Sequence, residues 1–490
     1  MKKFTSLLPV FFFFLMFSVF GQEMSDVQKI FPTDNTDADR FGWSVSMSGD
    51  FLVVGAPYDN ETGNWFGAAY IYKRSGNEWV QDTKITDNNG GQFGFSVAID
   101  GEYLVVGSIN TKNDQGIFTG AAFVYHYNGS VWEHEATLFA GTNENEEQVG
   151  TFVTVSGTTI AVSAVNNSDL HHPVFIFEKT KGGWTQVKKI VNTCMEVYSI
   201  SLYDTMLAIG YRHDNSVNSG AVHLVYRNNG NWDTTQVIVP EEGNENGAFG
   251  KSVSLYKNNL MVGAYGDYKS LNSAYIFTRE NGQWMEKAVL LPEDTIGYDV
   301  GWFNAVAIND RYALIGAVDA NYNGHHTGAA YLYEYENNEW HYKSMLTPTV
   351  NPNVIDGDSH FGRSVALYDT CFLVGASNMS NDTWFTTGAA FIYNCNYLPV
   401  GINEPLKKGD FTFSLYPNPV ADHLNLYFQS ISTREISLFD MSGKQKFHVT
   451  SSQKNISVNT SALASGSYLL KVKEGKKQVV KMVVKTVAED

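Results

Sequence analysis

Oxygen-bearing side chains alternate before a glycine in one stretch of the chain, at Asp319, Asn321 and Asn323. Alternating carboxylate and amide oxygens in a short loop can wrap a hard cation such as calcium. No carboxylate follows at the later ligand positions, where His325 and His326 stand. Asn and Gly also favour turns, because both tolerate a positive φ. The favoured interpretation is a polar turn, so no cofactor is predicted and a calcium site is kept as the alternative.

Histidine is the other residue type that could do chemistry, and it forms two pairs, His171-His172 and His325-His326. Histidines can bind metals, but adjacent side chains of a strand point apart, so one pair rarely completes a site. The sequence shows no nucleophile elbow, zinc-protease helix motif or phosphate-binding loop. No catalytic residue is therefore predicted.

Tryptophan could provide a platform for a ligand, and the chain has ten. Two of them, Trp65 and Trp384, stand in equivalent loops of the first and last copies of a repeat, away from the repeat's own tryptophan position. We expect these two residues to form an exposed ligand-binding patch. The tryptophans that do recur with the repeat mark a packing position, because every copy must bury the same surface; they are Trp79, Trp132, Trp184, Trp232, Trp284 and Trp340.

The repeat itself occurs seven times between residues 41 and 393. The third and fourth copies keep only part of the pattern. Each copy holds short apolar runs rich in Val, Ile, Tyr and Phe, separated by Gly, Asn and Asp, which is typical of strands joined by tight turns. Four strands in about fifty residues are typical of one blade of a β-propeller. The first copy reads Phe41-Gly42-Trp43-Ser44-Val45, then Leu52 to Pro57, Gly67 to Tyr72, and Trp79.

The seventh copy has no fourth strand after Tyr393, and the N-terminus offers a replacement. Residues 24–32 place Lys29 where the fourth strands of other copies have Lys84 and Lys189. A strand supplied from the N-terminus would leave no open sheet edge at the join. The sequence therefore predicts an all-β chain with a seven-bladed β-propeller closed by an N-terminal strand, followed by a small C-terminal β-sandwich.

The two ends of the chain differ from the repeats. Residues 1–21 have two lysines, an apolar core and a small residue, which is typical of a secretory signal peptide. That core is short for a membrane span, and no transmembrane segment is predicted elsewhere. The predicted domains are the propeller at 22–397, a linker at 398–410 and a C-terminal domain at 411–490.

Charge and cysteine content limit the kinds of binding partner and the cellular compartment that can be expected. Asp and Glu number 51 against 34 Lys and Arg, a net charge of −17. Nucleic acid is not expected as a partner, because the acidic repeats would repel it. Cys371 begins the second strand of the last copy and Cys395 follows its third strand, and such ends meet in a hairpin. We expect a Cys371–Cys395 disulfide in an exported protein, with two buried thiols as the alternative.

The tail shows Tyr416-Pro417-Asn418-Pro419, alternating strands, and Asp440 to Lys444 ahead of Leu463 to Tyr468. Period-two alternation is typical of a small β-sandwich. These motifs resemble the type A C-terminal sorting domain of the type IX secretion system in Bacteroidota. The resemblance implies that 411–490 engages the type IX secretion machinery and that the protein is secreted or attached to the outer-membrane surface. An appended carbohydrate-binding module is the alternative.

The Phe-Gly and Gly-Ala-Pro pairs resemble the FG-GAP repeats of integrin α-subunit heads and of bacterial surface proteins, over residues 24–397. The family's calcium loop would lie between those pairs, but here Met47 to Phe51 leaves room only for a tight turn. The resemblance therefore implies the fold without that calcium site.

The leading functional hypothesis is a secreted or cell-surface, adhesion-type propeller that binds an extracellular protein or glycan. The alternatives are a propeller enzyme acting on polysaccharide, as a lyase or hydrolase, and a structural component of the envelope. Paired carboxylates are what glycosidic hydrolysis needs, and no such pair recurs in the repeats, so binding is favoured over catalysis.

Overall fold

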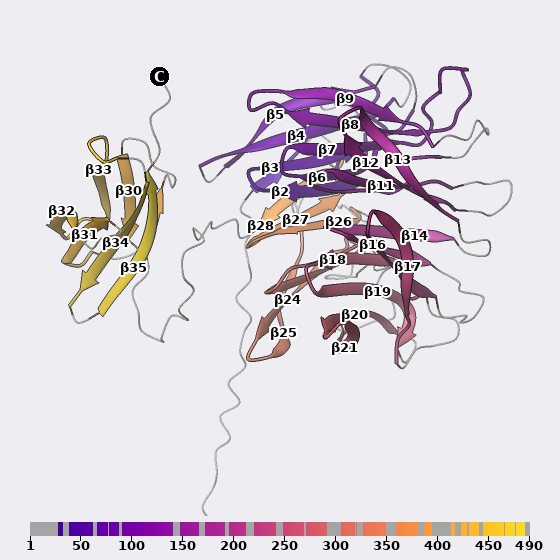
Figure 1. Ribbon diagram of the computed structural model, residues 1–490. Helices are drawn as coiled ribbons and strands as arrows, with labels where there is room; N and C mark the ends of the chain where they lie inside the picture. The colour runs from indigo at the N-terminus through magenta and orange to yellow at the C-terminus, as the bar shows by residue number, and fades with distance from the viewer. Residues whose placement is uncertain are drawn as a thin grey trace, which may run out of the picture. The chain divides into compact units, whose positions relative to one another are not determined.

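Figure 1 shows the computed structural model of the chain, which divides into two units, Met1–Cys395 and Asn396–Asp490. Within the described residues every helix-or-strand element is a β-strand, which confirms the all-β prediction. A membrane-spanning helix is not found in that part of the chain. The predicted signal peptide (1–21) and linker (398–410) lie outside it. The structure describes residues 28–32, 39–61, 66–76, 78–87, 91–140, 148–165, 172–191, 196–211, 220–241, 248–268, 271–291, 305–318, 320, 327–348, 359–380, 387–393, 413–416, 423–428, 431–440, 444–464, 466–475 and 477–485.

The described strands of the first unit form seven antiparallel sheets of four strands each, which we number one to seven by their first strands in chain order. The first strands are β2 (Ser44–Ser48), β6 (Phe93–Asp100), β10 (Val153–Ser156), β14 (Val197–Tyr203), β18 (Ser252–Tyr256), β22 (Ala305–Ile308) and β26 (Phe361–Tyr368). The second strands are β3 (Phe51–Ala56), β7 (Tyr103–Ser108), β11 (Thr159–Ser163), β15 (Met206–Tyr211), β19 (Asn259–Tyr268), β23 (Tyr312–Ala317) and β27 (Cys371–Ala376). The third strands are β4 (Ala68–Ser75), β8 (Ala121–Tyr127), β12 (Val174–Thr180), β16 (Ala221–Asn228), β20 (Leu271–Glu280), β24 (Ala329–Glu336) and β28 (Ala389–Tyr393). The fourth strands are β5 (Glu78–Thr86), β9 (Trp132–Leu138), β13 (Gly183–Ile190), β17 (Asn231–Ile238), β21 (Gln283–Leu290), β25 (Glu339–Leu346) and β1 (Gln28–Ile30).

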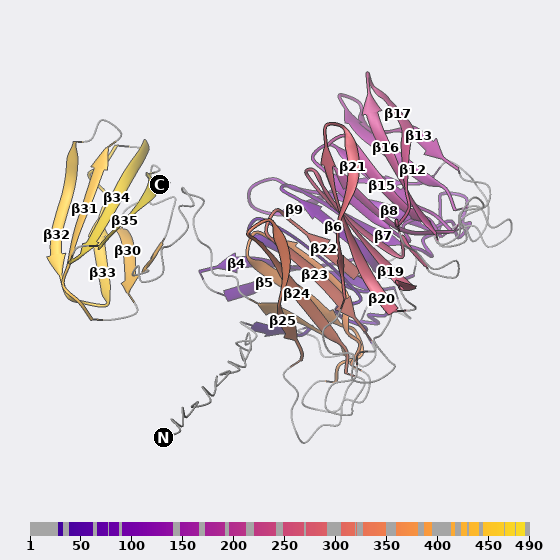
Figure 2. The ribbon, with the colours of Figure 1, turned by 90° about the horizontal axis from the view of Figure 1, so that it is seen from below.

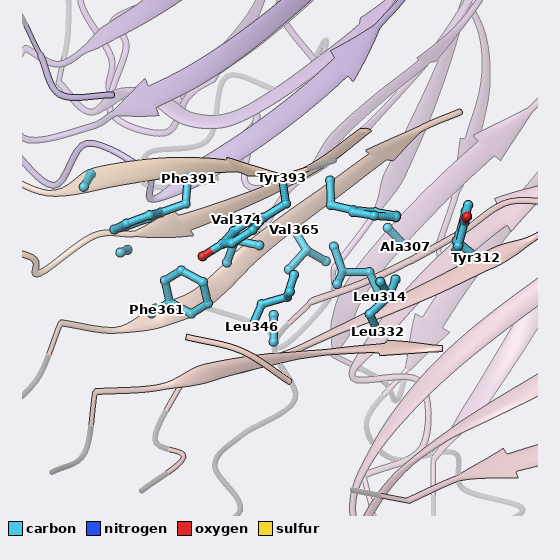
Figure 3. Close-up of a cluster of buried hydrophobic side chains, with 14 of the residues drawn as sticks. Ala307, Tyr312, Leu314, Leu332, Leu346, Phe361, Val365, Val374, Phe391 and Tyr393 are labelled. Carbon is cyan, nitrogen blue, oxygen red and sulfur yellow. The ribbon is translucent and has the colours of Figure 1, made fainter. Parts of the chain in front are cut away.

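Hydrophobic cores lie between neighbouring sheets. The second strands are almost fully buried, and the third strands are buried mainly over their first halves, because both faces are covered there. This burial explains why these runs are apolar without alternation. Figure 3 shows the core between the sixth and seventh sheets, where Phe361 packs edge-on against Phe391 with ring centroids 5.2 Å apart. Such T-shaped pairs add to the free energy gained from burial alone. The Phe that recurs in the repeat is thus a packing residue, and Phe41, Phe93, Phe249 and Phe361 are all fully buried.

The N-terminal strand β1 pairs with β28 and completes the seventh sheet. Lys29 stands opposite Phe391 in this register, as Lys84 stands opposite Tyr70 in the first sheet. Both lysine ammonium groups lie over the opposing ring, 5.4 Å and 5.1 Å from its centroid. The N-terminal strand β1 therefore makes the same cross-strand cation–π contact in the seventh sheet as the fourth strand β5 makes in the first.

A serine in the first strand joins one sheet to the next. Ser44 Oγ donates to the Gly94 carbonyl at 2.9 Å, and Ser364 Oγ donates to the Gly42 carbonyl at 2.9 Å. The second bond links the seventh sheet to the first, as does the backbone bridge between Phe41 and Gly388. Figure 1 shows β26, β27 and β28 beside β2 and β3. The contact between these chain-distant sheets therefore uses the same groups as the contacts between consecutive sheets.

Ion pairs and tryptophans secure the outer strands. Glu178 accepts two hydrogen bonds from Arg227 and one from Trp232 Nε1, at 2.7 to 2.8 Å. In the sixth sheet the buried Glu334 pairs with Arg311 and Lys343. Burial by itself would raise the pKa of Glu334, but the hydrogen bonds and positive charges of these two residues outweigh it and hold the pKa below its ordinary value.

The second unit contains two antiparallel sheets that share one core. Figure 2 shows the larger sheet, whose strands lie in the order β32, β31, β34 and β35. Arg434, 1% exposed, pairs with Glu474 at 2.6 Å and lies over the Phe428 ring at 4.2 Å. This buried cation joins the ends of the two inner strands of the larger sheet to β30 of the smaller sheet. The strands are β29 (Phe413–Tyr416), β30 (His423–Phe428), β31 (Arg434–Asp440), β32 (Gln445–Ser451), β33 (Asn455–Asn459), β34 (Gly466–Glu474) and β35 (Lys477–Lys485).

Candidate ligand-binding site

The residues that the sequence singled out for binding lie outside the described part of the chain. These are the predicted ligand patch, Trp65 and Trp384, and the alternative calcium ligands, Asp319, Asn321 and Asn323. Both remain predictions. Among the described residues, no cluster of three or more His, Cys, Asp or Glu side chains could hold a metal ion.

Cys371 is buried and disulfide-bonded. Its partner lies outside the described residues, as do both other cysteines, Cys194 and Cys395. Phe372 pairs with Tyr393 across the β27–β28 hairpin. β27 thus begins at Cys371 where β28 ends at Tyr393, and the Cys371–Cys395 bridge stays the prediction.

The described residues contain one position whose residue type differs from copy to copy, at the end of the first strand where the chain enters the sheet. It lies between a Gly and a Ser in the first, second, fifth and seventh copies, whereas the third copy has Phe152 in place of the Ser and the fourth has Val197 in place of the Gly. The Gly and Ser are needed for the contact between sheets, whereas the residue between them differs in almost every copy. A residue free of the packing constraint is available for binding. We call these residues the entry ring; in the described part of the chain they are Trp43, Phe95, Thr151, Tyr198, Lys251 and Arg363, all half-buried.

One part of the entry ring is an aromatic cluster with a cation on it. Arg363 Cζ lies over the Trp43 ring, 3.4 Å from its centroid. Trp43 in turn contacts Phe95, with centroids 5.5 Å apart, and Tyr58, with centroids 5.9 Å apart. These side chains come from the seventh, first and second sheets. The cluster therefore forms only where the seventh sheet meets the first.

A second cation–π pair lies elsewhere on the entry ring. Lys251 Nζ, from the fifth sheet, lies 4.0 Å from the centroid of the Tyr198 ring of the fourth sheet. A cation over an aromatic face gains about 0.5–1 kcal/mol at an exposed site and more when it is desolvated. Both cations of the described entry ring are therefore held in place by a neighbouring sheet's aromatic side chain.

The backbone before the entry ring is strained in four copies. Arg40, Gln92, Gln148 and His360 stand two residues ahead of the repeat's Gly in sequence and share a positive φ, between 46° and 67°. A side chain with a Cβ in this left-handed region costs about 1–2 kcal/mol. Such strain gathers at functional sites, where the surrounding structure maintains it. In three of these turns the carbonyl of the strained residue accepts a hydrogen bond from the entry-ring amide: Trp43 N–H donates to Arg40 O, Phe95 N–H to Gln92 O and Arg363 N–H to His360 O.

The arrangement can bind a ligand that has both an apolar face and a polar or charged group. Partly exposed aromatic rings suit the apolar face, and the two cations suit the polar group. This site was not among the sequence-based predictions, although Trp43 falls outside the recurring tryptophan position. The variation at this position is the sequence signal for the site. It becomes visible when the copies are aligned on Phe-Gly and Ser-Val and the residue between these two pairs is compared from copy to copy.

Comparison with known protein families identifies both parts of the chain. Residues 24–72, 79–125 and 232–277 match the FG-GAP repeat, and residues 414–486 match the secretion system C-terminal sorting domain. The chain thus carries FG-GAP repeats followed by a type IX sorting domain. No curated protein matches it.

Two solved structures that align with the chain do so at low identity. A chain from the crystal structure of the mitotic checkpoint complex is 12% identical, with a TM-score of 0.47, over 80% of this chain and 96% of its own length. A hypothetical selenium-binding protein from Sulfolobus tokodaii is 10% identical, with a TM-score of 0.43, over 64% and 80% of the two chains.

Proposed function

We propose that this FG-GAP repeat protein with a C-terminal sorting domain is an exported binding protein. Its ligand is an extracellular protein or glycan, and the entry ring is its binding site. The observation that carries the proposal is the variation of this one position among the four copies that keep the Phe, Gly and Ser around it, where it is Trp43, Phe95, Lys251 and Arg363. Packing would favour the same residue in these copies, as it does for their Phe, Gly and Ser.

The fold that we propose for the repeats is a closed seven-bladed propeller, with one sheet per blade and β1 as the last strand of the seventh. Closure is supported by Ser364 Oγ donating to Gly42, by the Phe41–Gly388 bridge, and by two hydrogen bonds between Gln28 and the Trp79 backbone. In a closed ring the first strands line the centre. The entry ring would then surround one mouth of the central channel.

The C-terminal unit directs the protein out of the cell. The sorting domain implies handling by the type IX secretion machinery and export to the cell surface or medium. We propose the domain order signal peptide (1–21), propeller (22–397), linker (398–410) and a sorting sandwich (411–490). Bacteroidota, where this machinery is found, would be the source.

The binding proposal is tested with the purified protein on an array of glycans and extracellular matrix proteins, in calcium and in chelator. The expected result is a specific ligand whose binding falls at least tenfold in Phe95→Ala. Its matched control is Tyr368→Ala, which removes a 40% exposed aromatic side chain from the opposite end of a first strand and should leave binding unchanged. Binding that is lost in chelator would support the calcium site at Asp319. A Trp65→Ala, Trp384→Ala double variant tests the predicted loop patch. An array without any specific ligand, or a ligand indifferent to Phe95, would overturn the assignment of the entry ring.

A further inference from the structure

We infer that the hairpin of residues 110–120 inserts into an apolar pocket of an extracellular protein, with Phe118 as the anchoring side chain. The inference rests on the proposed binding function and commits it to a protein ligand. The observation behind it is that Phe118, which is 44% exposed, is presented by an ordered hairpin whose base is bonded to the turn before the entry ring.

The hairpin is held together by its own hydrogen bonds. Asn113 Oδ1 accepts from the Gln115 and Ile117 amides, each at 3.0 Å. The Asn113 amide donates to the Ile117 carbonyl at 2.9 Å. Nearer the base, the Thr119 amide donates to the Thr111 carbonyl at 3.1 Å. Because these bonds lie within the hairpin, its conformation is set before a ligand binds, and less ordering entropy is lost on binding.

Phe118 is positioned within the hairpin and remains accessible at its surface. Lys112 forms an antiparallel bridge with Phe118, and the lysine ammonium lies 4.7 Å from the centroid of the phenyl ring. At the tip, a Cβ added to Gly116 would meet nothing within 4 Å. Asp114 and Gln115 beside it are exposed. The hairpin therefore projects from the sheet and carries an aromatic side chain on the projection.

The base of the hairpin is joined to the entry ring. The hairpin follows β7, whose last residue pairs with Phe93 at the entry end of β6. Asn110 Nδ2 donates to Gln92 Oε1 at 3.0 Å, and Gln92 has one of the strained backbones before the ring, with a φ of 67°. The Gln92 carbonyl in turn accepts from the Phe95 amide. One strained residue is thus bonded both to the hairpin and to the entry ring, and strain of this kind gathers at functional sites.

A projecting hairpin favours a protein over a glycan as the ligand. Small ligands are usually bound in concave sites, where polar groups converge on them. A convex, ordered loop instead enters a concavity of its partner, as long antibody loops do. An aromatic side chain that fills a pocket of the partner often supplies much of the binding free energy. The net charge of −17 favours a pocket with a neutral or basic rim, because an acidic partner would be repelled at long range.

Binding is tested by surface plasmon resonance on the purified protein, with fibronectin, fibrinogen, laminin and type I collagen as probes. Each probe is used before and after enzymatic removal of its glycans, and we expect at least one to bind equally in both forms. Phe118→Ala should weaken that binding about thirtyfold or more, because an aromatic anchor is removed. The control is Val131→Ala, which shortens a 52% exposed side chain just before β9, at the other end of the same sheet. This control should leave binding unchanged.

Amide hydrogen exchange tests the hairpin without any ligand. The Gln115 and Ile117 amides should be protected in the unaltered protein. Asn113→Ala removes the side-chain acceptor of both amides, so it should speed their exchange at least tenfold and weaken binding of the probe. Asn113→Asp keeps an oxygen acceptor and should restore both protection and binding. Asn113 is thus a positioning residue for Phe118.

Four results would overturn the inference. Binding that falls in Phe95→Ala but not in Phe118→Ala would leave the binding function standing and remove the hairpin from it. Binding that disappears when the probe loses its glycans would show that the ligand is a glycan. Exchange of the Gln115 and Ile117 amides as fast as in an unstructured peptide would show that the hairpin is not preformed. Failure of all four probes would overturn the protein ligand, and the glycan array then decides whether the binding function stands.

Discussion

Substituting a single glycine tests whether the sheets close into a ring. Gly375 lies in β27, where a Cβ would stand 2.1 Å from the Gly42 carbonyl oxygen and 2.4 Å from Ser364 Oγ. Its φ is not in the left-handed region, so Gly375→Ala adds a steric clash without backbone strain. Gly210 has the same surroundings between the fourth and fifth sheets, where a Cβ would meet the Gly250 carbonyl at 2.0 Å. Gly210→Ala is therefore a matched control, at a contact between two sheets that follow one another in the chain.

The expected loss of stability follows from the atoms involved. A methyl group forced into a packed contact costs about 1–3 kcal/mol, and separating Ser364 from Gly42 removes a buried hydrogen bond worth about 0.5–1.5 kcal/mol. Alanine regains about 0.5–1 kcal/mol over glycine inside a strand. Gly375→Ala should therefore lower the free energy of unfolding by about 1–4 kcal/mol, and Gly210→Ala should do the same.

Tryptophan fluorescence during urea unfolding measures this change in the first unit alone, because all ten tryptophans precede residue 396. Closure predicts that both variants shift the unfolding midpoint down by a similar amount. If the seventh sheet did not meet the first, Gly375 would have no backbone opposite it. Gly375→Ala would then leave the midpoint unchanged or raise it, while Gly210→Ala still lowered it, and that outcome would refute the closed ring.

Three further predictions follow from charged and sulfur-bearing groups. The pKa of Glu334 is depressed in the folded state, so its ion pairs stabilise the protein fully above the unfolded pKa of about 4.3. That stabilisation is lost as the pH falls through the lower, folded pKa. In Glu334→Gln the unfolding midpoint should therefore fall less steeply between about pH 5 and pH 3, and an unaltered slope would contradict this. Alkylation of the denatured, unreduced protein should label one cysteine and reduction two more, with peptide mass spectrometry joining Cys371 to Cys395; a Cys371 bridge to any other cysteine would disprove the pairing. Glu474→Gln should destabilise the C-terminal unit by roughly 2–3 kcal/mol, since it leaves the buried Arg434 without its charged partner, as followed by amide exchange in that unit; a loss below about 0.5 kcal/mol would show that the pair contributes little.

The strands could be predicted from the sequence because their signals are local. Leu-Val-Val-Gly and Gly-Ala-Ala-Tyr runs repeat, and Lys29 shares its offset with Lys84, so the sequence alone assigns even the N-terminal strand to the last sheet, as the β1–β28 pairing confirms. The contacts that join sheets could not be predicted, because Ser364 and Gly42 are far apart in sequence and neither a serine nor a glycine indicates which residue it will contact. The entry ring was not predicted for a different reason. A repeat is recognised by the residues that recur in every copy, whereas Trp43, Lys251 and Arg363 occupy a position where each copy has a different residue.

The strand that completes the seventh sheet also sets the order of events during folding. Ile30 pairs with Ala390, and bringing together ends separated by about 360 residues costs roughly 5 kcal/mol of chain entropy. A polypeptide emerges from the ribosome with its N-terminus first. β1 is therefore among the first segments to appear and has no partner until Ala389–Tyr393 has followed. A chain that stops short keeps both β1 and its last sheet unpaired and open to proteases, so the protein can finish folding only when every repeat has been delivered.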